Sequence, residues 1–190
     1  RMGSVHSSDE RALRGKEVLG ADDVARSLTR IAFEIIERNG DTEELVIAGI
    51  PTRGAFLAKR LVKRISEVGG LTAEYAIIDP TMFRDDLADK PLRTPKPTLI
   101  PPAGIDGRTV ILVDDVLYTG RTIKATLDAL SGIGRPSRVQ LAVLVDRGHR
   151  ELPIRPDYVG KNLPTSRQET VTILLKESDG RDGVLLGKEN

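Results

Sequence analysis

Along the chain, short continuous apolar runs alternate with longer stretches in which apolar residues recur every three or four positions. The recurring pattern is typical of amphipathic helices, whereas the short runs are typical of buried strands. Helices are predicted over residues 21–39, around Leu57, Leu61 and Ile65, and around Ile123, Leu127 and Leu130. Strands are predicted over residues 44–49, 72–78, 110–113, 139–145, 170–175 and 184–186.

The order of these elements predicts the fold class. Up to residue 122 it reads helix, strand, helix, strand, loop, strand, helix, which is typical of an α/β fold with a mostly parallel sheet flanked by helices. The 190 residues suffice for one sizeable core, so we expect a single domain over residues 1–190. We expect residues 1–13 to form a loosely ordered tail.

Two long segments interrupt this alternation. Residues 79–102 hold six of the eleven prolines and several charged residues. A loop of this length within a compact domain is usually a functional lid, and a plain surface excursion is the alternative. Its residues 98–100 are apolar enough to form a β-arm. Residues 146–168, the second segment, are rich in turn formers and basic residues.

The stretch over residues 110–122 carries the strongest chemical signal. Its apolar run leads to two adjacent carboxylates, Asp114 and Asp115, where the strand is expected to end, and then to a turn through Thr119 and Gly120. A turn of this kind that opens a helix directs backbone N–H groups at an anion. The carboxylates beside it can bind hydroxyls or a metal ion, so a ribose phosphate would fit. Capping is the simpler explanation, but a cap needs only one carboxylate.

The loop over residues 49–54 also follows a predicted strand. In an open parallel sheet, ligands bind beyond the carboxyl ends of the strands. Thr52 offers a hydroxyl there, and Arg53 offers a guanidinium suited to bidentate contact with phosphate. Alone this motif is weak, because many such loops contain Gly and Arg. Beside the acidic pair it predicts a second anion site, and two anion sites flanking a ribose describe phosphoribosyl pyrophosphate (PRPP).

Composition narrows the classes of function. The formal net charge of +1 does not predict nucleic-acid binding, which would need a local basic face. The chain has no cysteine, which excludes disulfides, thiolate metal sites and thiol catalysis and permits a cytoplasmic location. No apolar run approaches the ~20 residues of a membrane span, and the first residues lack the apolar core of a signal peptide, so no membrane partner is expected.

Residues 110–122 resemble the signature of the type I phosphoribosyltransferases, with the apolar strand, the acidic pair and the Thr-Gly-X-Thr turn. From about Leu28 onward, the chain resembles more narrowly the family of bifunctional pyrimidine operon regulators and uracil phosphoribosyltransferases. The segments that carry this likeness are residues 27–34, 49–54, 83–86 and 145–161. The resemblance implies the type I fold, a flexible lid at residues 79–102, a small hood at residues 146–168, a cytoplasmic location, and a homodimer or higher homo-oligomer.

The resemblance implies that uracil and PRPP are converted to UMP and pyrophosphate with Mg²⁺. Catalytic roles then belong to Asp114, Asp115, Arg53 and Arg84, with the two aspartates holding the ribose hydroxyls or metal, directly or through water. Substrate contacts belong to Thr52, Arg53, Tyr118, Thr119, Gly120, Arg121, Thr122, Tyr158, Val159 and Gly160. Purine-using members typically carry an acid at the position of Tyr118, where it contacts the base N7. Its absence here agrees with a pyrimidine substrate.

The resemblance also implies regulation through RNA. With UMP or UTP bound, the protein would bind a pyr messenger leader and reduce expression of pyrimidine biosynthesis genes. RNA contact would then belong to Thr29, Arg30, His149, Arg155, Lys161 and Thr165. Residues 146–167 hold five basic and three acidic residues, a modest basic excess, and solvated charges or ion pairs explain each of them singly. Phe33 departs from the family, since relatives often carry His there.

Two alternatives remain open. In the first, the chain is a phosphoribosyltransferase for another base, such as xanthine or orotate, without RNA regulation. In the second, it is a regulator that has lost its catalysis. The likeness over residues 145–161 and the identity of Tyr118 argue against the first. The intact acidic pair, Arg53 and the turn at Thr119 and Gly120 argue against the second.

Overall fold

The structure is a computed structural model that describes residues 15–42, 44–85 and 94–188. The tail expected at residues 1–13 lies outside the described residues, as does the middle of the expected lid, residues 86–93. None of the helices in the described part of the chain is long and apolar enough to cross a membrane.

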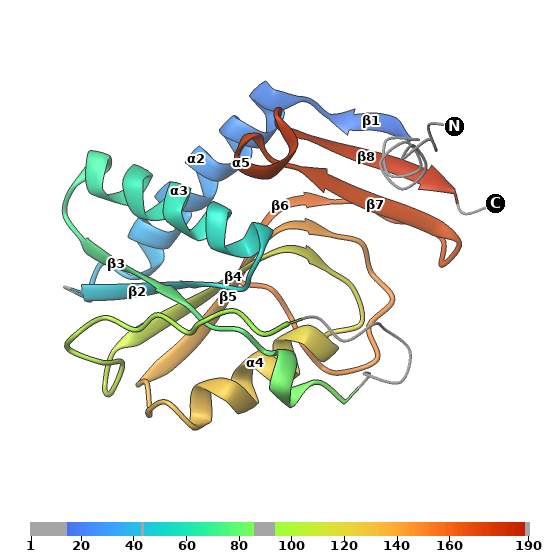
Figure 1. Cartoon of the computed structure of the whole chain (residues 1–190). Helices are drawn as coiled ribbons and strands as arrows, with labels where there is room; N and C mark the ends of the chain where they lie inside the picture. The colour runs from blue at the N-terminus through green and yellow to red at the C-terminus, as the bar shows by residue number, and fades with distance from the viewer. Residues whose placement is uncertain (1–14, 43, 86–93, 189–190) are drawn as a thin grey trace, which may run out of the picture.

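Five parallel strands form the central sheet, in the order β3–β2–β4–β5–β6. Their bounds are β2 Glu44–Gly49, β3 Thr72–Ile77, β4 Thr109–Leu117, β5 Arg138–Asp146 and β6 Tyr158–Asn162. Three helices flank the sheet: α2 Ala21–Arg38, α3 Arg53–Val68 and α4 Arg121–Ser131. Helices α2 and α3 cover one face and α4 covers the other (Figure 1). The predicted α/β fold with a parallel sheet is confirmed.

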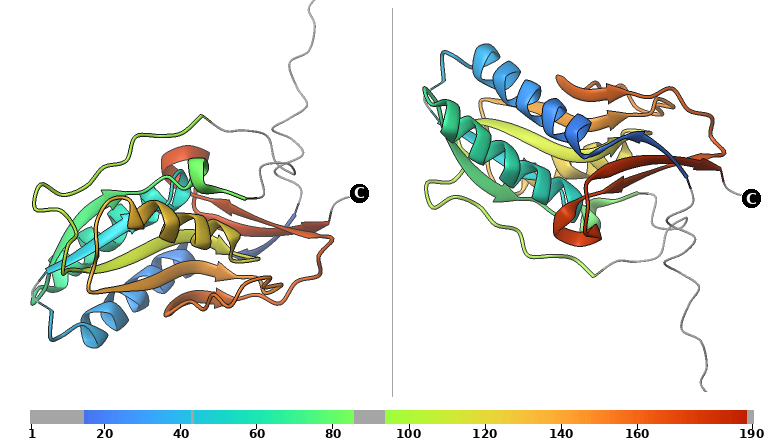
Figure 2. Two further views of the ribbon diagram at one scale, coloured as in Figure 1. Left: turned by 90° about the horizontal axis from the view of Figure 1, so that it is seen from below. Right: turned by 90° about the horizontal axis from the view of Figure 1, so that it is seen from above.

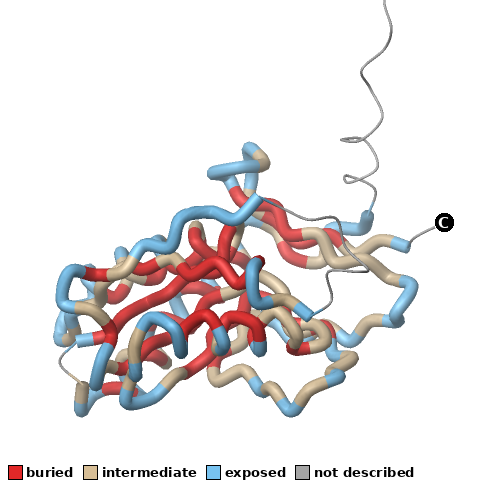
Figure 3. The backbone as a smooth tube through the Cα atoms, turned by 60° about the horizontal axis from the view of Figure 1, so that its bottom comes forward, coloured by how far each residue is buried: buried red, intermediate tan, exposed pale blue. Residues whose placement is uncertain are grey.

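Burial on both faces explains why the strands appear in the sequence as continuous apolar runs. Successive side chains of a strand point to opposite faces of the sheet. In β2, Leu45 and Ile47 join the core beneath α2 and α3, whereas Val46 and Ala48 join the core on the α4 side. The buried positions accordingly follow the strands through the middle of the molecule (Figure 3).

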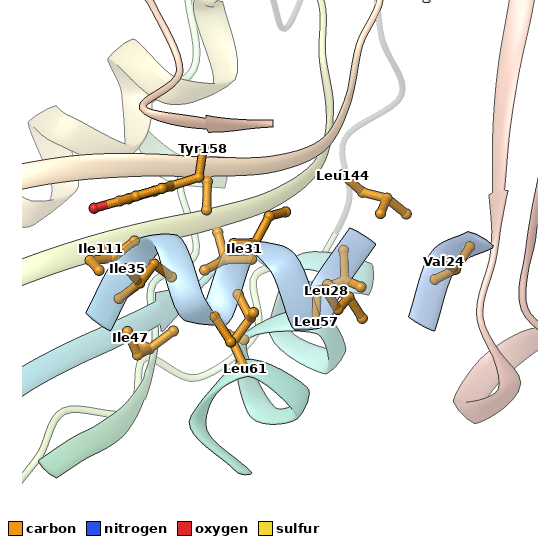
Figure 4. Packing of buried hydrophobic residues seen from close by; sticks show 14 of the residues in the cluster. Val24, Leu28, Ile31, Ile35, Ile47, Leu57, Leu61, Ile111, Leu144 and Tyr158 are labelled. Carbon is orange, nitrogen blue, oxygen red and sulfur yellow. The ribbon is translucent and has the colours of Figure 1, made fainter. Parts of the chain in front are cut away.

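The apolar stripe predicted for the first helix is confirmed. The stripe residues Val24, Leu28, Ile31 and Ile35 are each at most 1% exposed. Together with residues of α3 and of the sheet, they form one packed cluster (Figure 4). The helix begins where expected, because the Asp23 carboxylate accepts the backbone N–H of Gly20 at 2.9 Å. It ends at Arg38, one residue before the predicted end.

Strand β4 is longer than the sequence predicted. It does not end before the acidic pair but continues through both carboxylates to Leu117. The reason is its neighbour β5, which still pairs with β4 at this height and aligns Val145 with Val116. On the other side, β2 ends at Gly49, opposite Val113. The end of β4 that carries the acidic pair is therefore paired with a strand on only one side.

A second, three-stranded antiparallel sheet has the order β1–β8–β7. It is built from β1 Lys16–Leu19, β7 Glu169–Leu174 and β8 Gly183–Lys188, with the short helix α5 Lys176–Asp179 between β7 and β8. The two ends of the described chain meet in this sheet (Figure 2). The two strands predicted near the C-terminus are confirmed and pair as a hairpin, whereas the sequence pattern did not predict β1.

The segment expected to form a hood supplies a strand to the main sheet. Residues 158–162 form β6, which pairs in parallel with β5 and occupies the edge. This strand was not predicted, because it is short and holds Gly160, Lys161 and Asn162, which disrupt the apolar pattern of a strand. The expected β-arm at residues 98–100 is present as one antiparallel bridge between Leu99 and Ile77.

Candidate active site

The order of the strands creates a crevice between β2 and β4. From β2 the chain crosses through α3 on one face to β3, and from β4 it crosses through α4 on the opposite face to β5. The strand order therefore reverses between β2 and β4. In open α/β sheets, ligands bind at such a point, beyond the carboxyl ends of the strands. Both loops singled out in the sequence, residues 49–54 and the turn after β4, lie at this point.

The loop between β2 and α3 packs directly on the strand that carries the acidic pair. The backbone N–H of Ile50 donates to the Val113 carbonyl at 2.9 Å. At Gly54, a Cβ atom would stand 2.4 Å from the same carbonyl oxygen and 3.2 Å from the Asp114 Cα. Only a residue without a side chain allows this approach, so Gly54 sets the distance between the loop and the acidic pair.

The acidic pair is partly withdrawn from solvent. Asp114 and Asp115 are half-buried, and each carboxylate accepts the backbone N–H of the following residue, at 2.8 and 2.7 Å. Burial, together with the neighbouring Asp115 carboxylate, raises the pKa of Asp114 well above its usual range. Arg84 acts in the opposite direction on the same carboxyl. A carboxyl group whose charged form is destabilised in this way, at a crevice beyond the strand ends, is typical of a functional residue.

A cavity of about 350 Å³ lies beside Asp114. Seven of the predicted site residues line it: Arg84, Asp114, Tyr118, Thr119, Gly120, Arg121 and Thr122. The turn from Thr119 to Thr122 opens α4, whose first N–H groups have no carbonyl partner within the helix. Gly120 has φ 94°, a left-handed conformation that favours glycine. The structure thus brings the N-terminus of a helix and a carboxylate to one cavity.

The remaining crevice residues lie around this cavity and do not line it. Asp115 is adjacent to Asp114 but is not among the lining residues. The Thr52 hydroxyl accepts a hydrogen bond from the Lys96 ammonium at 2.7 Å. Arg53 begins α3, and its guanidinium binds the Asp179 carboxylate. Loop 49–54 therefore borders the acidic strand as a separate region.

The residues assigned to the base do not lie at this cavity. Tyr158 is buried, and its hydroxyl bonds to Asn39 and Gln140. The carbonyls of Val159 and Gly160 accept hydrogen bonds from the guanidinium of Arg30, at 3.1 and 2.7 Å. The reason is the position of β6, which pairs along its length with β5 and presents these groups to α2. Contact between this strand and a base stays a prediction.

The described flanks of the lid contact both loops. Arg84 donates to the Thr122 hydroxyl at 2.8 Å, and Asp85 accepts from Arg121 at 3.1 Å. On the other flank, the Lys96 ammonium donates a hydrogen bond to the Thr52 hydroxyl, and the Lys96 backbone N–H donates one to the Asp79 carboxylate. The described flanks of residues 79–102 are therefore joined to the α4 turn on one side and to loop 49–54 on the other, and the role of this segment as a lid stays a prediction.

Sequence reasoning missed five residues that line the cavity: the apolar Val116, Leu117 and Ile123, and the charged Arg147 and Glu151. Arg147 directly follows β5, and its guanidinium lies 4.2 Å from the ring centroid of Tyr118, a cation–π contact. It also donates to the Ser166 and Glu169 carbonyls, which hold it in place. Its position just after β5 was the available signal, because the rule that ligands bind beyond the carboxyl ends of parallel strands applies to this loop as well as to the other two.

Five of the six residues assigned to RNA form two groups. Thr29 and Arg30 are exposed on α2, and β6, which carries Lys161, packs beside this helix. His149 and Thr165 form the other group, in which the His149 Nε2 lies 2.6 Å from the Thr165 carbonyl. Arg155 is exposed in the connection between β5 and β6. Phe33 is 53% exposed one turn along α2 from Arg30, so an aromatic ring adjoins the first group.

The acidic pair is the best candidate for a metal site. Among residues 15–42, 44–85 and 94–188, no three His, Cys, Asp or Glu side chains gather closely enough to hold a metal ion. Two carboxylates fit Mg²⁺, which prefers oxygen ligands and takes most of its coordination shell from substrate and water. Asp114 and Asp115 would hold such an ion.

Comparison with known proteins shows the family of the chain. The phosphoribosyl transferase domain family matches residues 15–173. A protein of Streptomyces coelicolor named bifunctional protein PyrR is 60% identical over 90% of this chain and 89% of its own length. The protein of the same name from Corynebacterium glutamicum is 54% identical over 92% of this chain and 93% of its own.

Comparison with solved structures shows the same fold and nothing further. A hypoxanthine phosphoribosyltransferase from Staphylococcus aureus superposes with a TM-score of 0.67 at 19% identity, over 95% of this chain and 97% of that one. The Trypanosoma cruzi hypoxanthine phosphoribosyltransferase gives 0.68 at 16% identity, over 92% and 97%. The chain thus belongs to the phosphoribosyl transferase domain family and, within it, to the group of bifunctional PyrR proteins.

Proposed function

We propose that the protein is a uracil phosphoribosyltransferase, which converts uracil and PRPP to UMP and pyrophosphate, and that it also regulates pyrimidine biosynthesis genes by binding RNA when a uridine nucleotide is bound. The observation that carries the catalytic part is the meeting of Asp114 and the α4 turn at one cavity, with loop 49–54 packed on the same strand. The name of the relatives supports both parts.

The acidic pair would act on the ribose. Transfer of a glycosyl group passes through a transition state in which positive charge develops at the anomeric carbon. Asp114 and Asp115 would hold the ribose hydroxyls, and their negative charge would stabilise the cationic sugar. The raised pKa of Asp114 reflects the same arrangement, in which a carboxylate is unfavourable until a cation or hydroxyl donors approach it.

The two loops would bind the two ends of PRPP. The N–H groups of the α4 turn and the Thr122 hydroxyl would hold the 5′-phosphate, with Arg84 already at that hydroxyl. Thr52 and Arg53 would bind the pyrophosphate, and Lys96 at Thr52 would add positive charge there. When bound at the acidic pair, Mg²⁺ would neutralise charge on the departing pyrophosphate. The lid would exclude water, which otherwise hydrolyses the donor.

The base would occupy the part of the cavity near Tyr118 and Arg147. The stacked pair of guanidinium and phenol ring offers a flat, polar-edged surface. No carboxylate stands at position 118 to bind a purine N7, which favours a pyrimidine. The backbone of Tyr158, Val159 and Gly160 stays our prediction for further base contacts once a substrate is bound.

A direct assay tests the catalytic proposal. The protein is incubated with PRPP, Mg²⁺ and labelled uracil, orotate, xanthine or hypoxanthine in separate reactions, and nucleotide formation is followed. We expect UMP from uracil, and rates with the other bases that are at least tenfold lower. A preference for another base would establish the first alternative. No product from any base would establish a regulator without catalysis.

The RNA part of the proposal concerns the exposed face of α2 and β6. Thr29, Arg30, Phe33 and Lys161 would meet the RNA there, with charge for the phosphates and an aromatic ring for an unpaired base. His149, Arg155 and Thr165 would extend this surface. We further propose a homodimer or larger homo-oligomer in the cytoplasm, where the leader RNA and the nucleotides occur.

Lys161→Gln is expected to weaken binding of a pyr leader RNA several-fold. The slope of log affinity against log salt concentration should fall by about 1, as for the loss of one phosphate contact. The measurement is a filter-binding titration at several salt concentrations, with and without UMP. Arg135→Gln is the matched control, because Arg135 is exposed in the loop between α4 and β5, away from α2 and β6. RNA binding that ignores both UMP and salt would contradict the regulatory proposal.

A further inference from the structure

The C-terminal hairpin contacts loop 49–54 through one ion pair. The guanidinium of Arg53 donates from Nε and Nη2 to the two carboxylate oxygens of Asp179, at 3.2 and 2.8 Å. This is a bidentate pair, the strongest geometry for a charged hydrogen bond between side chains. The two side chains are 33% and 17% exposed, so solvent screens the pair only in part. No role follows for Asp179 from the sequence, since it is 126 residues from Arg53.

Asp179 is itself held in place by two further hydrogen bonds from its own segment. Its carboxylate also accepts the Leu175 N–H and the Ser178 hydroxyl, both at 2.9 Å. Partial burial acts to raise the pKa of Asp179, but the hydrogen bonds from Arg53, Leu175 and Ser178 outweigh it and hold the pKa below its usual value. Asp179 therefore stays charged at neutral pH and forms a fixed anchor.

A second set of ion pairs fixes the hairpin to α3. Arg60, two turns after Arg53 on that helix, donates to the carboxylates of both Glu177 and Asp182. These two residues flank Asp179 in the sequence. Because α3 and the hairpin are joined at two places, the carboxylate of Asp179 has little freedom to move away from Arg53.

We propose that Asp179 is a positioning residue that orients Arg53 for the pyrophosphate group. The pair occupies one edge of the guanidinium, and among the described residues no hydrogen bond reaches the remaining nitrogen, Nη1. That nitrogen stays available for a pyrophosphate oxygen, while the fixed carboxylate prevents the long side chain from sampling other rotamers. This inference rests on the pyrophosphate role proposed for Arg53.

The opposite possibility is that Asp179 competes with pyrophosphate for Arg53 and so inhibits its binding. The two possibilities differ in the sign of one effect. Removing a positioning carboxylate weakens binding of PRPP and pyrophosphate, whereas removing a competitor strengthens it. UMP separates this effect from a general disturbance, because UMP carries the 5′-phosphate and the base but no pyrophosphate.

The test is Asp179→Asn, which keeps the size of the side chain and an acceptor for the Leu175 N–H. We expect the KM for PRPP in the forward reaction, and for pyrophosphate in the reverse reaction, to rise about tenfold, as for loss of one charge-assisted hydrogen bond. We expect kcat to change by less than about threefold, and the Kd for UMP to stay unchanged. Asp179→Glu should recover part of the affinity for PRPP.

Glu17→Gln is the matched control. It neutralises one carboxylate of the same small sheet, in the exposed pair with Arg181, and should leave all constants unchanged. An unchanged or lower KM for PRPP in Asp179→Asn would overturn the positioning role, as would an equal loss of UMP binding. If the unaltered protein transfers no phosphoribosyl group, the proposed function has failed. Normal transfer with unaffected Asp179 variants would refute this inference alone.

Discussion

Replacing Asp115 by Asn is expected to lower the rate of UMP formation about 10²- to 10³-fold while the fold stays intact. An amide keeps the size of the side chain but removes the negative charge that favours the cationic sugar, and one of its hydrogen-bonding atoms becomes a donor. The measurement is the initial rate with saturating uracil and PRPP, beside a thermal unfolding curve of the same preparation. Near-normal turnover would refute the ribose-holding role of Asp115.

The neighbouring variant Asp114→Asn tests the same pair through stability. The folded protein raises the pKa of Asp114, so wild-type stability falls as pH rises from the usual Asp value of about 4 toward the raised value. Asn carries no such penalty. We therefore expect Asp114→Asn to melt at a higher temperature than wild type near pH 7, with the difference vanishing below about pH 4. If the variant melts below wild type at neutral pH, the charged Asp114 carboxylate does not destabilise the folded protein, and this prediction is wrong.

Gly54→Ala is expected to have the other large effect, because it separates the two halves of the site. The new Cβ would meet the Val113 carbonyl oxygen at 2.4 Å, so α3 and loop 49–54 must move away from β4. Overpacking of this kind costs about 1–3 kcal/mol of stability. A displacement of about 1 Å between reacting groups lowers catalysis about 10²-fold. Chemical denaturation measures the first effect, and the initial rate of UMP formation measures the second.

Gly132→Ala provides the comparison for this substitution. Gly132 ends α4 with φ −78° and ψ −13°, which any residue adopts, and the nearest atom to its Cβ position is the Ala129 carbonyl at 3.5 Å. We expect unchanged turnover and a gain in stability of about 0.4–1 kcal/mol. Equal behaviour of the two variants would show that the approach of α3 to β4 does not control the site.

Much of the local structure followed from the sequence. Apolar residues that recur at helical spacing had to be buried on one side, and Val24, Leu28, Ile31 and Ile35 are buried as a stripe. Strand β2 was predicted with its observed bounds, because its apolar run is short, continuous and closed by Gly49. The strands that escaped prediction are β1 and β6, two edge strands whose short, mixed sequences depend on their partners more than on their own pattern.

The candidate site followed from the sequence only in part. Its two loops could be predicted, since a strand, a small-residue turn and a helix adjoin one another in the chain. The end of β4 could not be predicted, because it depends on pairing with β5, a strand formed by later residues. For the same reason, nothing local indicated that Arg147 would stack on Tyr118, or that the backbone of β6 would bond to Arg30.

By itself, the sequence determined the α/β class, the helices that cover the sheet, and the positions of the acidic pair and of the two strand–turn–helix loops, because each depends on residues close together in the chain. Only the tertiary structure decided which of these groups meet. The reversal of strand order between β2 and β4 places loop 49–54 against Asp114, and the C-terminal hairpin brings Asp179 to Arg53. Such contacts join residues far apart in the chain, and their geometry arises only when the sheet and its helices pack together.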